Sequence, residues 1–138
     1  MSARDAFHQI VRTALDKDGW KITHDPYPLQ AESFNLAIDL GAEKIIAAER
    51  ANQKIAVEIK SFLGASKIPE FYGALGQFIA YRSALNLQES DRVLYLAVSS
   101  DIYEKFFLTL FIQKLIRENK LYLLTYNIER ETIEEWIK

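Results

Sequence analysis

A carboxylate and an ammonium group stand two residues apart in the segment from Ile55 to Phe62, where apolar and other residues alternate. Because successive side chains of a β-strand point to opposite faces, Glu58 and Lys60 are predicted to share one face, about 7 Å apart along the strand. Ile59 and its apolar neighbours would occupy the other face. Taken alone, the pair favours a solvated ion pair on the outer face of a half-buried hairpin.

Two more carboxylates precede the partner strand, which is predicted over residues 44–50. Asp39 and Glu43 share parity, so an extended segment would project both toward Glu58 and Lys60. Crowded carboxylates repel one another unless a cation neutralises them, and all-oxygen ligands favour Mg²⁺ or Mn²⁺ over zinc. A neighbouring lysine complements a substrate that carries phosphate. The alternative is that Asp39 caps a turn before the glycine two residues on.

The spacing of apolar residues predicts the elements that must position these groups. Helices are predicted over residues 2–18, 66–85, 101–119 and 129–137, and strands over 20–23, 44–50, 54–62, 92–98 and 121–126. Ser66 and Asp101 are the predicted N-caps of the two middle helices, and the segment from Leu29 to Leu36 is ambiguous. Strands that alternate with helices need crossover connections. The sequence therefore predicts an α/β sandwich with a mixed central sheet and flanking helices.

Length and composition exclude several classes of protein. A chain of 138 residues fits one domain, residues 1–138, because single cores grow to roughly 150 residues before chains divide. The net charge of -2 predicts that any contact with DNA is local, and the absence of cysteine excludes disulfides, zinc-cysteine sites and thiol nucleophiles. No Gly-rich phosphate loop or Ser-His-Asp set is present. Without a signal-peptide pattern or a membrane-spanning run, we expect a cytoplasmic protein.

The helix predicted over residues 66–85 carries polar groups that can face the site. Its apolar stripe is formed by Ile68, Phe71, Leu75, Phe78 and Ile79. Gln77 and Tyr81 lie roughly opposite that stripe, where they are either solvated or turned toward Glu58 and Lys60. Glycine inside a helix costs about 1 kcal/mol relative to alanine, so Gly73 and Gly76 indicate the close approach of a backbone or ligand.

The helix predicted over residues 101–119 has apolar residues on more than one side. Burial on two sides is one explanation, and an interface is the other. We expect an interface, with Phe106, Phe107 and Phe111 as its anchors, in a homodimer or in a complex with a companion protein.

In its order of motifs the chain resembles the PD-(D/E)XK nuclease superfamily. Asp39 and the triplet Glu58-Ile59-Lys60 match its signature, although Ile38 stands where that signature often has proline. Gln77 and Tyr81 resemble the Gln-X-X-X-Tyr element of RecB-like members. The resemblance implies a restriction-endonuclease-like fold that hydrolyses phosphodiesters in DNA. It also implies catalytic roles for Asp39, Glu58, Lys60 and Gln77, with Mg²⁺ or Mn²⁺ on Asp39, Glu58 and the Ile59 carbonyl.

The running sequence also resembles the XisH family of cyanobacterial proteins, named for control of excision of the fdxN DNA element. The matching stretches are residues 5–8, 18–26, 39–43, 55–62 and 74–77, continued by 94–98. This resemblance implies a role in DNA recombination beside a site-specific recombinase and an XisI-type companion, without implying cleavage. Many nuclease superfamily members carry a glutamate on the first helix, where this chain offers Asp5 or His8. A non-catalytic accessory protein on a nuclease-like scaffold is therefore the alternative to an enzyme.

Overall fold

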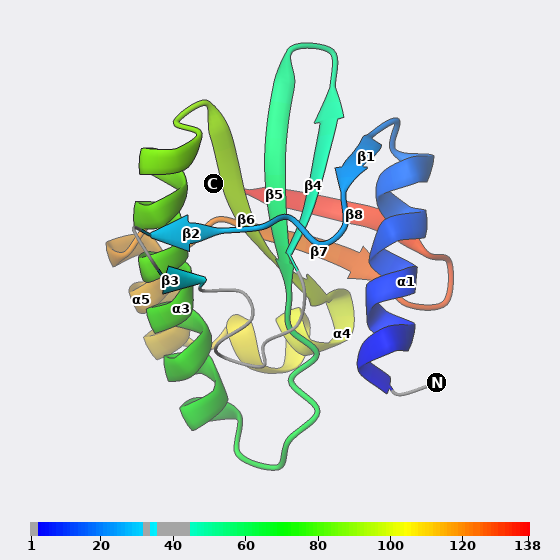
Figure 1. Cartoon of the computed structure of the whole chain (residues 1–138). Helices are drawn as coiled ribbons and strands as arrows, with labels where there is room; N and C mark the ends of the chain where they lie inside the picture. The colour runs from blue at the N-terminus through cyan, green and yellow to red at the C-terminus, as the bar shows by residue number, and fades with distance from the viewer. Residues whose placement is uncertain (1–2, 32–33, 36–44) are drawn as a thin grey trace.

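The computed structural model describes residues 3–31, 34–35 and 45–138 as a mixed α/β fold around a six-stranded sheet (Figure 1). The strand order is β1-β4-β5-β6-β7-β8, with β5-β6 and β6-β7 parallel and the other pairs antiparallel. The strands are β1 (Lys21–His24), β4 (Ile45–Arg50), β5 (Gln53–Ile59), β6 (Arg92–Ser99), β7 (Leu123–Asn127) and β8 (Thr132–Ile137). Strands β2 (Gln30–Ala31) and β3 (Phe34–Asn35) pair separately. The predicted mixed sheet is confirmed.

Helices cover both faces of the sheet. Helix α1 (Ala3–Lys17) lies on one side and α3 (Lys67–Gln88) on the other (Figure 1). The segments α4 (Ser100–Ile102), η1 (Tyr103–Phe107) and α5 (Leu110–Glu118) follow β6, and side chains from η1 and α5 join the α3 core. Because β5 is a central strand, alternate residues enter two cores. Ala56 packs on the α3 side, whereas Ile55, Val57 and Ile59 pack on the α1 side.

The buried face of α3 differs in part from the predicted stripe. Ile68 is 47% exposed and Ile79 is 41% exposed, so both predictions of core positions are wrong. Tyr81 and Leu85 are buried instead, in line with Phe71 and Phe78. The buried face of α3 therefore consists of Phe71, Ala74, Phe78, Tyr81, Ala84 and Leu85.

The helix predicted over residues 101–119 is interrupted. Its cap is Ser99, whose hydroxyl accepts a hydrogen bond from the Ile102 backbone at 3.2 Å, and the prediction of Asp101 as the cap is wrong. A π-helical turn, η1, ends before Thr109, which has extended backbone angles and starts α5. Apolar residues point in several directions along this stretch because two differently oriented segments each bury their own face.

The predicted C-terminal helix over residues 129–137 is wrong, because β8 is a strand paired with β7. A register shift opposite Thr125 and Tyr126 interrupts its alternation. Ile133 and Trp136 consequently pack on the same core although they are three residues apart. A bulged strand thus reproduces the spacing of a helix. Among the described helices, none is long and apolar enough to cross a membrane.

Candidate active site

Glu58 lies near the carboxyl end of β5, with Ile45 of β4 on one side and Leu96 of β6 on the other. Its side chain shares a face with Ala56, whose methyl group packs into the core beneath α3. The helix covers this face, so Glu58 is 0% exposed. The alternative of a solvated pair on an outer face is therefore wrong.

Lys60 follows the last residue of β5 and pairs with Glu58, as the alternation predicted. Its Nζ lies 3.7 Å from Glu58 Oε1, and its side chain is 20% exposed. The Lys60 backbone N–H donates to the Ala97 carbonyl at 3.1 Å, which extends the β5-β6 ladder by one residue. The buried carboxylate is thus linked to solvent through an ammonium group held at the end of the sheet.

Helix α3 contributes two polar side chains to this region. Burial, reinforced by the negative charge of Glu58, raises the pKa of Tyr81 to about 12, so its phenol is protonated throughout the physiological range. Gln77, one turn earlier, is partly buried, and its Oε1 is buried without a hydrogen-bond donor among the described residues. Tyr81 is on the buried face with Phe78, so the prediction that it lies opposite the stripe is wrong. Burial excludes the solvated alternative, and the influence of Glu58 on the pKa of Tyr81 is consistent with an orientation toward the site.

A hollow of about 350 Å³ opens between the end of β5 and α3. Lys60 and Gln77 both line it, together with Gly73 of the helix. A Cβ atom at Gly73 would meet no described atom within 4 Å, so the glycine widens the hollow rather than allowing a backbone to pack against it. The candidate site is therefore a polar hollow with an ammonium group beside it.

Glu70 is a residue of this hollow that sequence reasoning missed. It lines the same space, and its Oε1 is buried with no hydrogen-bond partner in the described part of the chain. Gly64 makes room for it, because a Cβ at that position would lie 2.2 Å from Glu70 Oε1. The available signal was spacing, since residues seven apart on a helix share a face and Glu70 precedes Gln77 by two turns.

The loop after Lys60 is held by hydrogen bonds and by packing. Lys67 Nζ donates to the carbonyls of Phe62 at 2.7 Å and of Gly64 at 2.6 Å. Phe62 has a positive φ of 52°, and its buried ring contacts Phe107 edge-on at a centroid distance of 5.3 Å. Packing of Phe62 and the hydrogen bonds of Lys67 therefore fix the conformation of the loop that lines the hollow.

Asp39 and Glu43 lie outside the described residues, so their predicted convergence on Glu58 stays a prediction. The Ile59 side chain packs into the core on the α1 side. Within this residue, the backbone carbonyl is therefore the group that could coordinate a cation. His8 is not at this site, since its Nε2 bonds Asp25 Oδ2 at 2.8 Å. Over residues 6–30 and 45–138, no group of three or more His, Asp or Glu side chains is close enough to hold a metal. The donors near the hollow are all oxygens, which suit Mg²⁺ or Mn²⁺ once a further carboxylate is supplied.

Known proteins resemble this chain closely. A family model described as XisH protein matches residues 1–134. The crystal structure of an XisH family protein from Nostoc punctiforme shares 50% identity with a TM-score of 0.90, covering 97% of this chain and 100% of that one. A structure named as an fdxN element excision controlling factor protein from Anabaena variabilis shares 52% identity with a TM-score of 0.89, covering 97% and 99%. No curated protein matches the chain.

Proposed function

The chain belongs to the XisH family, and from that premise we propose that it controls excision of a DNA element through a Mg²⁺-dependent phosphodiester hydrolysis site. One structure in this family is named as an fdxN element excision controlling factor, which supports the biological role. The chemistry is supported by one observation above all, the fully buried Glu58 ion-paired with Lys60 at the end of a central strand beside a polar hollow. We further propose that the scaffold is restriction-endonuclease-like.

The burial of Glu58 suits a role in chemistry. A buried carboxylate costs several kcal/mol of desolvation, which nearby cations and hydrogen bonds must offset, and the Lys60 ammonium lies 3.7 Å from it. A hydrophobic residue at the same position would avoid that cost. Retaining the charge is consistent with a group that binds a cation, since buried carboxylates and perturbed groups gather at functional sites.

In the proposed site Asp39 and Glu58 would hold Mg²⁺ or Mn²⁺ together with the Ile59 carbonyl. When bound, the ion would lower the pKa of a coordinated water and neutralise phosphoryl oxygens. Lys60 orients the attacking water or stabilises the negative charge that develops on the phosphate, because its ammonium group reaches the hollow.

Helix α3 orients the substrate side of the proposed site. The Gln77 amide lines the hollow and can donate to a phosphate oxygen through its nitrogen. Burial and the charge of Glu58 keep the Tyr81 phenol protonated. Tyr81 therefore adds a polar group near that carboxylate without adding a second negative charge.

Cleavage assays test the proposed chemistry directly. Supercoiled, linear and single-stranded DNA should be nicked or cut in Mg²⁺ or Mn²⁺ and remain intact in EDTA. Glu58→Gln, Lys60→Ala and Asp39→Asn should each reduce the rate on the order of 100-fold or more, because each removes a metal ligand or a charge that stabilises the transition state. Glu118→Gln, an exposed carboxylate of α5, is the matched control. Cleavage by Glu58→Gln at the wild-type rate would rule out this site.

Cation binding can be measured without activity. A divalent ion that binds only the folded protein stabilises it by mass action, about 1.4 kcal/mol when the free ion is tenfold above its Kd. Mg²⁺ or Mn²⁺ should raise the melting temperature of the wild type and leave that of Glu58→Gln unchanged. An equal response of both proteins would assign the effect to the acidic surface instead.

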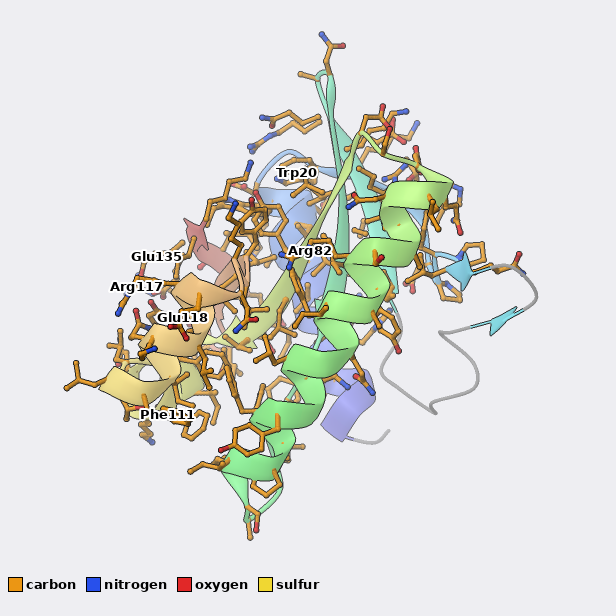
Figure 2. All side chains as sticks on the ribbon, turned by 90° about the vertical axis from the view of Figure 1, so that its left-hand side faces the viewer. Trp20, Arg82, Phe111, Arg117, Glu118 and Glu135 are labelled. Atoms are coloured by element: carbon orange, nitrogen blue, oxygen red, sulfur yellow. The ribbon has the colours of Figure 1, made fainter. Side chains whose placement is uncertain are left out.

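Exposed apolar side chains around the start of α5 favour a second candidate function, that of a non-catalytic accessory protein. Leu110 is 88% exposed, and Leu108 and Phe111 are each 52% exposed; Phe111 is labelled near the start of α5 in Figure 2. Such a surface fits contacts with the recombinase, an XisI-type companion or a second copy of the chain. Phe107 is 0% exposed, so its prediction as an interface anchor is wrong, and Phe106 is partly buried against the core.

Sedimentation separates the two candidates. Leu110→Ser and Phe111→Ser should weaken association, alone or with the companion added, while their melting temperatures stay near that of the wild type. If these variants abolish excision while Glu58→Gln supports it fully, the accessory function is correct. If Glu58→Gln abolishes excision and the surface variants do not, the hydrolytic function is correct.

A further inference from the structure

A second hollow, of about 480 Å³, lies on the α1 face of the sheet, opposite the face that carries Glu58. Its floor is apolar, formed by Ile55, Val93 and Tyr95 of the adjacent strands β5 and β6. Trp20 and Trp136 also line it, although they are far apart in the sequence. Apolar side chains of two adjacent strands therefore form the bottom of the hollow, and two indole side chains lie at its side.

The aromatic groups pack on one another and are held in place. The Trp136 ring lies 4.9 Å from that of Tyr95, nearly perpendicular at 78°, and 5.5 Å from that of Trp20. Trp20 and Tyr95 are buried, whereas Trp136 is partly exposed at the edge of the hollow. A rigid, partly exposed indole backed by two other rings can stack with a planar aromatic ligand at little cost in conformational entropy.

Cationic groups surround the aromatic base. The Arg50 guanidinium carbon lies 4.4 Å from the centroid of the Trp20 ring, in a cation–π contact. Its Nη1 donates a hydrogen bond to the Asp18 carbonyl at 2.7 Å, which holds the guanidinium over that indole. Lys54 and Lys138 line the hollow nearer to solvent. Asp91 is the carboxylate among the described lining residues, and it lies 3.4 Å from Lys54. Arg50 is also ion-paired with Asp18 at 3.1 Å, and Lys54 lies 3.4 Å from Glu89 as well as from Asp91. Both lysines are at the rim, where exposed ion pairs are weak and can exchange their carboxylate partner for a phosphate.

We infer that this hollow binds a nucleotide, with the base stacked on Trp136 and the phosphate held by Lys54 and Lys138. An apolar base with a few charged groups at the rim is the usual composition of a small-ligand site. Nucleotides combine the planar ring and the anion that the two parts of this hollow recognise. A free nucleotide and a nucleotide unit of single-stranded DNA present the same chemistry. This binding does not depend on the hydrolytic site, because the two hollows lie on opposite faces of the sheet.

Tryptophan fluorescence reports on this hollow specifically, because both tryptophans of the chain line it. The full chain is titrated in EDTA at low salt with deoxyadenosine monophosphate, deoxyadenosine, inorganic phosphate and a short thymidine oligonucleotide. Saturable quenching by the nucleotide at lower concentrations than by the nucleoside, with no quenching by phosphate alone, is the expected result. Quenching by the oligonucleotide at lower nucleotide concentrations supports a DNA strand as the ligand, and the reverse order supports a free nucleotide.

Two kinds of variant complete the test. Lys54→Ala combined with Lys138→Ala should weaken nucleotide binding about tenfold or more, because both phosphate contacts are removed, and Lys105→Ala on η1 is the matched control. Trp136→Leu should weaken it to a similar extent while circular dichroism verifies the fold. Glu58→Gln should bind normally, which separates this site from the hydrolytic one. Absence of quenching, or equal affinity in the lysine variant and the wild type, would overturn the inference.

Discussion

Glu89 joins the start of β6, the hairpin and the segment at Tyr27, so its charge is predicted to stabilise the fold in a pH-dependent way. Arg92 Nε donates to Glu89 Oε1 at 2.8 Å, and the Tyr27 hydroxyl donates to the same oxygen at 2.7 Å. Lys54 Nζ lies 3.4 Å from Oε2. The hydrogen bonds from Arg92, followed by that from Tyr27, lower the pKa of Glu89 from 4.5 to about 2.

The magnitude follows from linkage between the pKa and stability. A shift of this size corresponds to about 3 kcal/mol at 1.36 kcal/mol per pKa unit, and solvent screening of a side chain that is 25% exposed reduces it to about 1 to 2 kcal/mol. Since the pKa is lower in the folded state, the stabilisation is complete above pH 4.5 and is lost as the pH falls toward about 2. Glu89→Gln should therefore reduce the free energy of unfolding by about 1 to 2 kcal/mol at pH 7.

Urea unfolding followed by circular dichroism measures this difference. Between the wild type and Glu89→Gln it should be largest at pH 7 and shrink steadily below pH 4.5. Glu118→Gln on α5, whose side chain is 54% exposed, should change stability by less than about 0.5 kcal/mol at any pH. A difference for Glu89→Gln that stays constant from pH 7 to pH 2.5 would refute the electrostatic reasoning and assign the loss to packing.

The remaining predictions concern the site and the segment after β6. Glu58→Gln should lower the pKa of Tyr81 below about 12 in a spectrophotometric titration, because the carboxylate charge that opposes phenolate formation is removed; an unchanged pKa would contradict their coupling. Phe107→Ala should reduce the free energy of unfolding by about 3 to 5 kcal/mol, whereas Phe111→Ala should cost under about 1 kcal/mol, as measured by urea unfolding. Lys67→Ala frees the two carbonyls that it binds and should increase amide hydrogen exchange in the loop over residues 61–66, with no change at β7 as the internal control.

Local sequence patterns were sufficient to predict much of the fold. The alternation at Ile55 to Ile59 predicted β5, and the apolar spacing of the first helix predicted α1. Both signals arise from the periodicities of the backbone itself, 2 and 3.6 residues, and need no knowledge of neighbours. The pairing of Glu58 with Lys60 belongs to the same class, because residues two apart on a strand share a face in any fold.

The spacing of apolar residues predicted the wrong element where contact with another segment changed which residues are buried. The register shift between β7 and β8 brings Ile133 and Trp136 onto one core, which imitates a helix in the sequence. The break at Thr109 divides one predicted helix in two, so that Phe107 enters the core while Phe111 stays exposed. The shift depends on how β8 pairs with β7, and the burial of Phe107 depends on contacts with Phe62 and Phe71, which are remote in the chain.

For the candidate site, the sequence by itself determined which groups exist and which share a face: Glu58 with Lys60 on one strand, and Gln77 with Tyr81 on adjacent turns of one helix. Only the tertiary structure decided that α3 covers that face of β5, so that Glu58 is buried and Tyr81 lies under its charge. It alone brought Glu70 to the same hollow, across from Gly64. The reason is that strand and helix periodicity are properties of a few consecutive residues, whereas burial and charge coupling arise from segments that only the folded chain brings together.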